Sequence, residues 1–413
     1  MLYTVLLTLW SAVVHICAPF LISRRLKKEL EHSLRYTERY GVSDQARPKG
    51  ELIWFHGASV GESLSILPII QKITKQKPDA HFLITTTTTA AQRVVSARMS
   101  KNTVHQFIPF DAIGWVNKFL DHWQPKAIFF IESEIWPNIL WQAHRRNIPI
   151  TLLNARLSET SLRNWLCIKK ISRKLWGCFS AIYTQSDIFT QRFHKLGASC
   201  AKTLGNIKLL SEKLPFDDSQ YLHWKKQISG RPCWVAASTH KGEEEIIFKI
   251  HKVLKKDIPD LLTIIVPRHV ERCDDVMQKR EDLTVARFTD QYLHDYDVLL
   301  VDAMAKLGVF YRLSSIAFIG GSLVPVGGHN PLEPSMIGAF PLWGPHFFNV
   351  NDMMYLFEEM PCQQIDIDQL TDALKDLLNH PQKVAVLVES LQQRIMNRQQ
   401  MVDQKIDELV KIT

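Results

Sequence analysis

Three charged side chains in the first half of the chain have the types and positions that acid–base chemistry requires. Glu62 follows an apolar run and the small-residue loop HGASVG (56–61), which predicts a position in the first turn of a helix. A carboxylate there could be a general base, or only a group that the helix dipole stabilises. Glu132 ends another apolar run. Lys208 could neutralise a substrate anion, or could be an ordinary surface lysine.

A second set of residues, in the C-terminal half, has the chemistry of a nucleotide-phosphate site. Arg268 follows an apolar run, and its planar guanidinium can bind a phosphate through two hydrogen bonds. The glycine-rich stretch GGSLVPVGGHNPLEP (320–334) places Asn330 and Pro331 at an expected helix start, where backbone N–H groups can bind an anion. Glu333 could accept hydrogen bonds from ribose hydroxyls, or be an ordinary helix-start glutamate.

Sequence signals for metals and cofactors are weak. Asp295/Asp297 and Asp366/Asp368 have the D-x-D spacing that many sugar transferases use, but neither pair follows the carboxyl end of an expected strand. We therefore expect solvated turn carboxylates, no metal site and no cofactor. The sequence contains no P-loop, dinucleotide fingerprint, H-E-x-x-H motif or G-x-S-x-G motif.

Alternating apolar and amphipathic segments predict two doubly wound α/β domains that face a cleft. Non-alternating runs such as AIFFI (127–131) are typical of parallel strands with helices on both faces. Strands are expected at 52–56, 81–86, 105–109, 126–132, 150–154 and 181–185, and again at 234–237, 262–266, 284–287, 298–301, 316–319 and 341–343. Ligands of such sheets bind beyond the carboxyl ends of the strands, where the residues above lie.

The N-terminus predicts a membrane anchor. Residues 2–22 carry no charged side chain and are long enough for a helix to cross a bilayer, whereas the cluster RRLKK (24–28) follows at once. Positive residues stay on the cytoplasmic side, so the rest of the chain is expected there. The alternative is an apolar helix that packs on the domain. The basic segment 23–49 could contact lipid head groups or be a solvated helix face.

Composition excludes several broad classes of protein. The chain has 413 residues, with 46 % hydrophobic and 22 % charged residues, which are ordinary values for a globular protein of two or three domains. Its formal charge of +8 favours an acidic partner. No nucleic-acid module is recognisable, and the basic cluster adjoins the apolar segment, so lipid or a phosphorylated substrate is favoured over nucleic acid. The seven scattered cysteines form no C-x-x-C motif and indicate a reducing compartment.

The expected organisation has six parts. They are an anchor helix (1–22), a basic juxtamembrane segment (23–49), an N-terminal Rossmann-like domain (50–209), an irregular linker (210–230), a C-terminal nucleotide-binding domain (231–380) and a C-terminal helix (381–413).

Several motifs, in order along nearly the whole chain, resemble the Kdo (3-deoxy-D-manno-octulosonic acid) transferases of lipopolysaccharide biosynthesis. They are HGASVGE (56–62), ESEIWPN (132–138), NARLS (154–158), GNIK (205–208), PRH (267–269) and GGSLVPVGGHNPLEP (320–334). The resemblance implies a GT-B fold and an inverting, metal-independent transfer of Kdo from CMP-Kdo. The acceptor implied is the tetra-acylated disaccharide bisphosphate precursor of lipid A, bound by the N-terminal domain at the cytoplasmic face of the inner membrane.

The resemblance also implies roles for individual residues. Glu62 matches the general base of the family, and Glu132 and Lys208 match its transition-state stabilisers. The positions that match CMP contacts are Pro267, Arg268, Ala305, Lys306, Leu307, Asn330, Pro331, Leu332 and Glu333. The family usually has Gly-Glu-Leu where this chain has Ala305, Lys306 and Leu307, so backbone contacts can persist there but a glutamate contact cannot.

Two other interpretations remain open from the residues alone. One is a GT-B transferase that uses a UDP-sugar and a lipid acceptor. The other is a membrane-tethered nucleotide-binding protein without turnover, although such a protein need not keep Glu62, Glu132 and Lys208 together.

Overall fold

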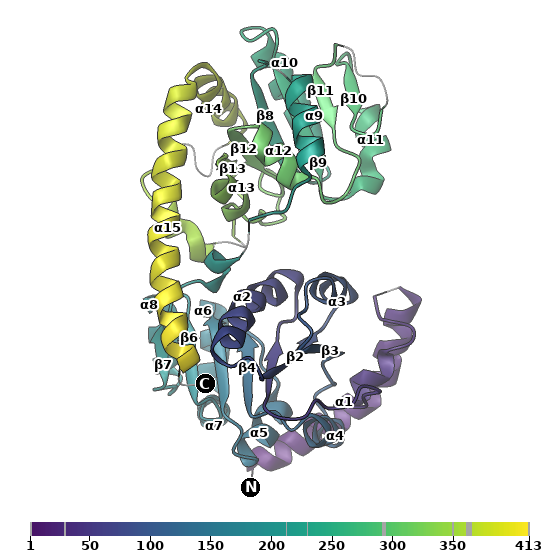
Figure 1. Cartoon of the computed structure of the whole chain (residues 1–413), viewed down its shortest axis with the longest axis vertical. Coiled ribbons are helices and arrows are strands. Elements are labelled where there is room, and N and C mark those ends of the chain that lie inside the picture. Colours follow the sequence, from purple (N-terminus) through teal and green to yellow (C-terminus); the bar gives the residue numbers. More distant parts are fainter. Residues whose placement is uncertain are drawn as a thin grey trace. The chain divides into compact units, whose positions relative to one another are not determined.

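The computed structural model describes residues 2–28, 30–211, 213–228, 230–290, 295–348, 351–360 and 366–411. The chain forms two compact units, one of Met1–Ser211 with Arg398–Thr413 and one of Glu212–Asn397. Each unit contains a parallel sheet with helices on its two faces (Figure 1). The expected pair of doubly wound α/β domains is therefore confirmed.

The first unit has a seven-stranded sheet of order β3-β2-β1-β4-β5-β6-β7. Its strands are β1 (Leu52–His56), β2 (His81–Thr86), β3 (Thr103–Phe107), β4 (Ala127–Ile131), β5 (Ile150–Ala155), β6 (Ala181–Thr184) and β7 (Ala201–Thr203). Strand order reverses between β1 and β4, which is where ligands of doubly wound sheets bind.

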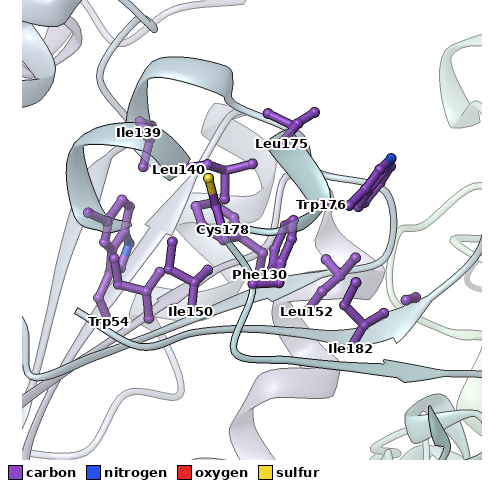
Figure 2. Close-up of a cluster of buried hydrophobic side chains, with 14 of the residues drawn as sticks. Trp54, Phe130, Ile139, Leu140, Ile150, Leu152, Leu175, Trp176, Cys178 and Ile182 are labelled. Atoms are coloured by element: carbon purple, nitrogen blue, oxygen red, sulfur yellow. The ribbon is translucent and has the colours of Figure 1, made fainter. Parts of the chain in front are cut away.

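Helices cover both faces of this sheet and bury its apolar side chains. They are α2 (Val60–Gln76), α3 (Thr89–Ser96), α4 (Ile113–Trp123), α5 (Pro137–Arg145), α6 (Glu159–Cys167), α7 (Lys169–Trp176) and α8 (Asp187–Lys195), with short 3₁₀ helices η1 (Tyr36–Tyr40) and η2 (Ile207–Leu210). Figure 2 shows the cluster in which Trp54 and Phe130 of the sheet pack with Leu140 and Trp176 of the helices. This core fixes the strand ends that carry the candidate site.

The second unit has a six-stranded sheet of order β10-β11-β9-β8-β12-β13, which reverses between β8 and β12. Its strands are β8 (Cys233–Thr239), β9 (Leu262–Pro267), β10 (Val285–Arg287), β11 (Val298–Leu300), β12 (Ile316–Ile319) and β13 (Phe340–Trp343). Its helices are α9 (Asp218–Ile228), α10 (Glu243–Lys255), α11 (Cys273–Gln278), α12 (Leu307–Leu313), α13 (Leu332–Ile337) and α14 (Ile367–Asn379), with η3 (Val270–Arg272) and η4 (Asn351–Leu356).

The structure differs from the sequence-based expectation in two places. The segment expected as an irregular linker contains helix α9, whose Trp224 stacks on Phe288 and packs near Phe310. Strand β7 was not expected, because its three residues are too few to show a period.

The long C-terminal helix, α15 (Pro381–Lys411), divides its residues between the two units (Figure 1, yellow). In the second unit, Gln392 donates to the Ser335 carbonyl oxygen over 3.4 Å. In the first unit, Lys72 of α2 forms ion pairs with Asp403 at 2.9 Å and Asp407 at 2.7 Å. The first part of α15 therefore packs on the second unit, and its last part packs on the first unit.

The N-terminal helix α1 (Leu2–Lys27) packs along the first unit beside α4 and α5. By length and composition it could cross a membrane. Trp10 donates to Asp111 over 3.1 Å, and the ring of Tyr3 meets that of Trp141 edge-on. A buried stripe runs along the packed face, and includes Tyr3, Leu7, Ser11, Ala18 and Ile22. The other face exposes large apolar side chains, which include Leu9, Ile16 and Phe20.

Basic residues of the segment 23–49 form ion pairs and hydrogen bonds within the first unit, which neither lipid contact nor a solvated helix face predicts. Arg39 is buried, pairs with Glu31 at 3.1 Å and donates to the Thr87 carbonyl oxygen. Arg35 pairs with Glu38 at 2.6 Å. The lipid-contact and solvated-face interpretations are therefore both wrong for Arg39, because its guanidinium holds together loops of the first unit. The exposed basic residues near the end of α1 include Arg24, Lys27 and Lys28.

Candidate functional site

The loop after β1 positions Glu62 by a helix cap. Ser59 is the N-cap of α2, and its hydroxyl oxygen accepts a hydrogen bond from the backbone N–H of Glu62. The Glu62 carboxylate turns back and accepts from the Ser59 hydroxyl at 2.7 Å and from the Ala58 backbone N–H at 2.9 Å. This reciprocal arrangement is close to a capping box, and it holds the carboxylate over the end of β1.

The surroundings of Glu62 raise its carboxyl pKa above the ordinary value. Burial is the largest cause, and the charges of Glu132 and Glu134 also raise the pKa. The hydrogen bonds from Ser59 and Ala58 act in the opposite direction. A carboxylate with a raised pKa is a stronger base, which is the property that proton abstraction requires.

Glu132 lies where β4 ends, in an unusual backbone conformation. Its φ of 63° is in the left-handed region, which non-glycine residues rarely adopt. The residue is 5 % exposed, and its carboxylate forms ion pairs with Lys208 Nζ at 2.5 Å and Arg156 Nε at 3.3 Å. A buried carboxylate needs such partners, because removing a charge from water is costly unless it is paired.

Lys208 reaches Glu132 from the 3₁₀ helix η2, which two asparagines hold in place. Asn206 caps η2 and accepts from the Lys208 backbone N–H at 3.0 Å. Asn154, at the end of β5, accepts from the Ile207 backbone N–H at 3.0 Å through its side chain. The motifs NARLS and GNIK are thus joined to each other, and both supply a cation to Glu132.

Glu134 follows Glu132 by two residues, beyond the end of β4. Like Glu132, it raises the pKa of Glu62 through its charge. Burial raises the pKa of Glu134, but hydrogen bonds with His56 and Trp136 outweigh it and lower the pKa.

The structure therefore brings the three predicted residues of the first unit into one group. Glu62 follows β1 and Glu132 follows β4, on the two sides of the point where strand order reverses. The sequence analysis assigned no role to Arg156 or to Ser59. The Ser59-x-x-Glu62 spacing is a capping signature that could have identified Ser59, whereas no local pattern identifies Arg156.

Three of the predicted nucleotide contacts, Arg268, Asn330 and Glu333, lie close together in the second unit. Arg268 follows β9 and donates its backbone N–H to the Thr239 carbonyl oxygen at 3.0 Å. Burial raises the pKa of Glu333, and the Asn330 side chain and the Arg268 charge lower it in part. Asn330 also accepts from the Leu332 backbone N–H at 3.0 Å.

Residues 305–307 lie in the turn that leads into α12. Ala305 has a φ of 61°, a conformation that favours glycine. Lys306 donates to Gln220 of α9 at 2.9 Å, so its side chain serves a contact within the second unit. Leu307 begins α12. Glycine would adopt the conformation of residue 305 without strain, and the lysine has a structural contact.

Glu243, at the start of α10, is a structural residue that the sequence analysis missed. Its buried carboxylate accepts hydrogen bonds from the backbone N–H groups of His240, Gly321, Ser322 and Leu323. These hydrogen bonds join the loop after β8 to the loop after β12, at the point where strand order reverses.

The D-x-D strings have structural roles, and the expectation of solvated carboxylates is wrong for Asp297. Asp297 is buried, pairs with Lys255 and accepts from Thr284. Asp366 caps α14 in a capping box with Gln369. Among the residues that the structure describes, no group of three or more His, Cys, Asp or Glu side chains is placed to hold a metal ion.

Comparisons with known proteins show which enzymes the chain is similar to. A family model described as 3-deoxy-D-manno-octulosonic-acid transferase (kdotransferase) matches residues 34–211. The chain is 35 % identical over 368 residues to the 3-deoxy-D-manno-octulosonic acid transferase of Rickettsia felis, covering 87 % of this chain and 79 % of that protein. The enzyme of the same name from Haemophilus influenzae is 34 % identical over 380 residues, covering 89 % and 88 %.

A solved structure shows the same fold at low sequence identity. Anabaena Alr3699/HepE in complex with UDP and glucose has a TM-score of 0.56 and 15 % identity, with coverage of 88 % of this chain and all of that one. This likeness supports the GT-B type arrangement of two parallel-sheet α/β domains and nothing finer.

The ion pairs of Glu132 lead to a stability prediction. Lys208→Met leaves a buried carboxylate with only the partly exposed Arg156 as an ionic partner. We expect the free energy of unfolding to fall by about 1–3 kcal/mol, the cost of an incompletely satisfied buried polar group. Urea unfolding followed by tryptophan fluorescence measures the change. Lys202→Met, at an exposed position of β7, is the matched control and should change stability little; equal losses in both variants would contradict the assignment.

Proposed function

Because the chain belongs to the 3-deoxy-D-manno-octulosonic acid (Kdo) transferase family, we propose that it transfers Kdo from CMP-Kdo to the tetra-acylated disaccharide bisphosphate precursor of lipid A. Family membership supports the glycosyl transfer and the CMP-Kdo donor. The observation that carries the proposed mechanism is the position of the Glu62 carboxylate beside Glu132, which is itself paired with Lys208 and Arg156.

In the proposed reaction, Glu62 is the general base. Its carboxylate takes the proton of an acceptor hydroxyl as the hydroxyl oxygen forms a bond to the anomeric carbon of Kdo. The bond from that carbon to the phosphate oxygen of CMP breaks, and CMP leaves with the electron pair. One displacement inverts the anomeric configuration, and general-base assistance of this kind contributes roughly 10²–10⁴-fold to the rate.

Positive side chains would stabilise the negative charge that the reaction transfers to CMP. In the second unit, Arg268 is exposed beside Glu333 and Asn330, which supports a nucleotide site formed with Pro267, Pro331, Leu332 and the turn 305–307. Lys208 would stabilise the transition state, held in place by Glu132. Fixed cations act strongly where water is excluded, and they can supply the charge that a metal ion supplies in other transferases.

We propose that α1 and the basic residues after it hold the enzyme on the cytoplasmic face of the inner membrane. The packed stripe on α1 supports a helix that lies in the membrane surface and exposes Leu9, Ile16 and Phe20 to lipid. Arg24, Lys27 and Lys28 are exposed at the end of the helix and could meet anionic head groups, each contributing on the order of 1 kcal/mol.

An apolar groove beside the candidate catalytic loop supports a lipid acceptor. The α1 groove, as we name it, has a volume of about 530 Å³, within the usual range for small-molecule sites of roughly 300–1,000 Å³. It lies between α1 and the segment that directly follows Glu132. Its lining residues are Trp10, Val13, Val14, Cys17, Ala18, Leu21, Phe110, Asp111, Ser133, Glu134, Ile135, Trp136 and Pro137. An acyl chain in this groove would place the polar part of its acceptor near Glu132.

Replacing the proposed base tests the mechanism directly. Glu62→Gln keeps the shape of the side chain and removes its basicity. We expect transfer from CMP-Kdo to fall by about 10²-fold or more, while CMP binding is unchanged, because the nucleotide site lies in the other unit. Product formation is followed by mass analysis of the lipid, and CMP binding by calorimetry.

Glu159→Gln, at an exposed helix start in the same unit, is the matched control and should retain full activity. Retained turnover in Glu62→Gln would remove Glu62 as the base. If wild-type protein formed no Kdo-containing lipid, the proposed function itself would fail.

Removal of metal ions tests the proposed source of positive charge. Because Lys208 and Arg268 are assigned the role of stabilising the leaving phosphate, we expect the wild-type transfer rate to be unchanged in excess EDTA. The same assay with added Mg²⁺ is the reference. A rate that is lost in EDTA and restored by Mg²⁺ would contradict a metal-independent reaction.

A charge placed in the α1 groove tests acyl-chain binding. We expect Val14→Asp to raise the KM for the acylated acceptor by about tenfold or more, because a carboxylate in an apolar site repels a hydrocarbon chain and keeps water there. Ile16→Asp introduces the same charge on the exposed face of the same helix, so it controls for altered membrane attachment. Equal KM changes in both variants would exclude the groove as the acyl site.

A further inference from the structure

Two histidines of the second unit form a hydrogen-bonded pair that the proposed mechanism does not use. His240 directly follows β8, and His329 lies in the glycine-rich loop after β12. Their Nε2 atoms are 2.8 Å apart, and their ring planes are within 9° of parallel. A hydrogen bond between two imidazoles requires one Nε2 to donate and the other to accept. The pair therefore shares one proton between its two facing nitrogens.

The pair bridges the place in the sheet where ligands of this architecture bind. Strand order reverses between β8 and β12, and each histidine comes from the loop after one of these strands. The two strand ends approach closely, since a Cβ on Gly320 would overlap the Ser238 carbonyl oxygen. Glu243 accepts hydrogen bonds from backbone N–H groups of both loops, including that of His240. These backbone contacts therefore fix the two loops that carry the histidines.

Two arginines, a third histidine and two glutamates surround the pair, and Glu243 accepts from the His240 backbone N–H. Arg268 and His269 act on both histidines, and Arg272 acts on His240. Glu244 is the acidic group with an opposite effect on His240, and its carboxylate is already engaged by Arg272 at 3.0 Å. Burial is the main cause that lowers the pKa of His240, and it lowers that of His329 to about 4. At neutral pH the pair is therefore uncharged, and the exposed Arg268 beside it can attract an anion.

We propose that His240 and His329 are an anion-binding pair that takes up one proton from solvent when the phosphate or the carboxylate of the donor binds. This inference rests on the proposed function, since it assumes a donor of the CMP-Kdo kind. In the free protein the two Nε2 atoms bond to each other. In the complex each Nε2 carries a hydrogen, and both donate to oxygens of the anion, with Arg268 beside them.

Electrostatics gives the direction of the effect. The cations that disfavour a second proton on the pair are offset when an anion arrives, so binding raises the pKa values of the imidazoles. Between the pKa of the free pair and that of the complex, binding consumes a proton, and anion affinity weakens as pH rises. Below the lower pKa and above the higher one, this contribution to the pH dependence disappears.

Calorimetry in buffers of different ionisation enthalpy measures the proton directly. The full-length protein is titrated at pH 7 with cytidine, with CMP and with CMP-Kdo, in the absence of acceptor. We expect no proton uptake with cytidine. Uptake that appears with CMP identifies the phosphate as the anion, and uptake that appears only with CMP-Kdo identifies the sugar carboxylate.

Variants show whether the pair is the site of uptake. His240→Gln and His329→Gln each keep a hydrogen-bonding side chain but cannot take up a proton at the replaced position. We expect either variant to lose the uptake and to bind the anionic ligand about 10- to 100-fold more weakly, the effect of one hydrogen bond to a charged group. Unchanged cytidine binding would show that each variant is folded. His380→Gln, at the exposed end of α14, is the matched control and should behave as wild type.

Three results would overturn the inference. One is that CMP and CMP-Kdo bind with the same heat in every buffer. This result would support the proposed donor and exclude proton uptake. Another is uptake that persists in both glutamine variants, which assigns the proton elsewhere. The last is no binding of any of the three ligands, in which case the proposed donor fails together with the pair.

Discussion

The arrangement of the first unit depends on one constraint: a carboxylate buried at a strand end must be paired. Glu132 is held by Lys208 and Arg156, which come from η2 and from the end of β5. Satisfying Glu132 therefore fixes three separate segments of the chain against one another. The same negative charge raises the pKa of Glu62. The ion pairs of Glu132 thus stabilise the fold, and the charge of the same carboxylate also contributes to the basicity of Glu62.

The second unit also contains a buried carboxylate, but there backbone groups, and not side chains, are its partners. Glu243 is buried and satisfied by four backbone N–H donors, so it needs no lysine or arginine partner. Burial nonetheless raises its pKa, as it does for Glu62. Arg268, in the same unit, is exposed. In each sheet, a buried glutamate therefore joins segments near the point where strand order reverses.

Much of the fold could be predicted from the sequence because parallel strands are short apolar runs with a clear pattern. All twelve expected strands begin within two residues of their observed starts, and β1 and β12 begin at the expected residue. Long-range pairing could not be predicted. Nothing local to Arg156 indicates that its partner is Glu132, and nothing near Lys306 indicates that it reaches Gln220 of α9. The charge of Arg39 suggested a surface role, whereas its burial depends on contacts with distant loops.

The contacts of Asp111 determine what removal of the N-terminal helix would do to the first unit. Its buried carboxylate accepts from the Trp10 indole of α1 and from the backbone N–H groups of Asn138 and Ile139, which begin α5. A shortened protein without α1 would therefore lose a donor to this carboxylate and uncover the aromatic side chains beneath the helix. Such a truncation changes the folding stability of the first unit, so this helix is an integral element of that unit and not a detachable tether.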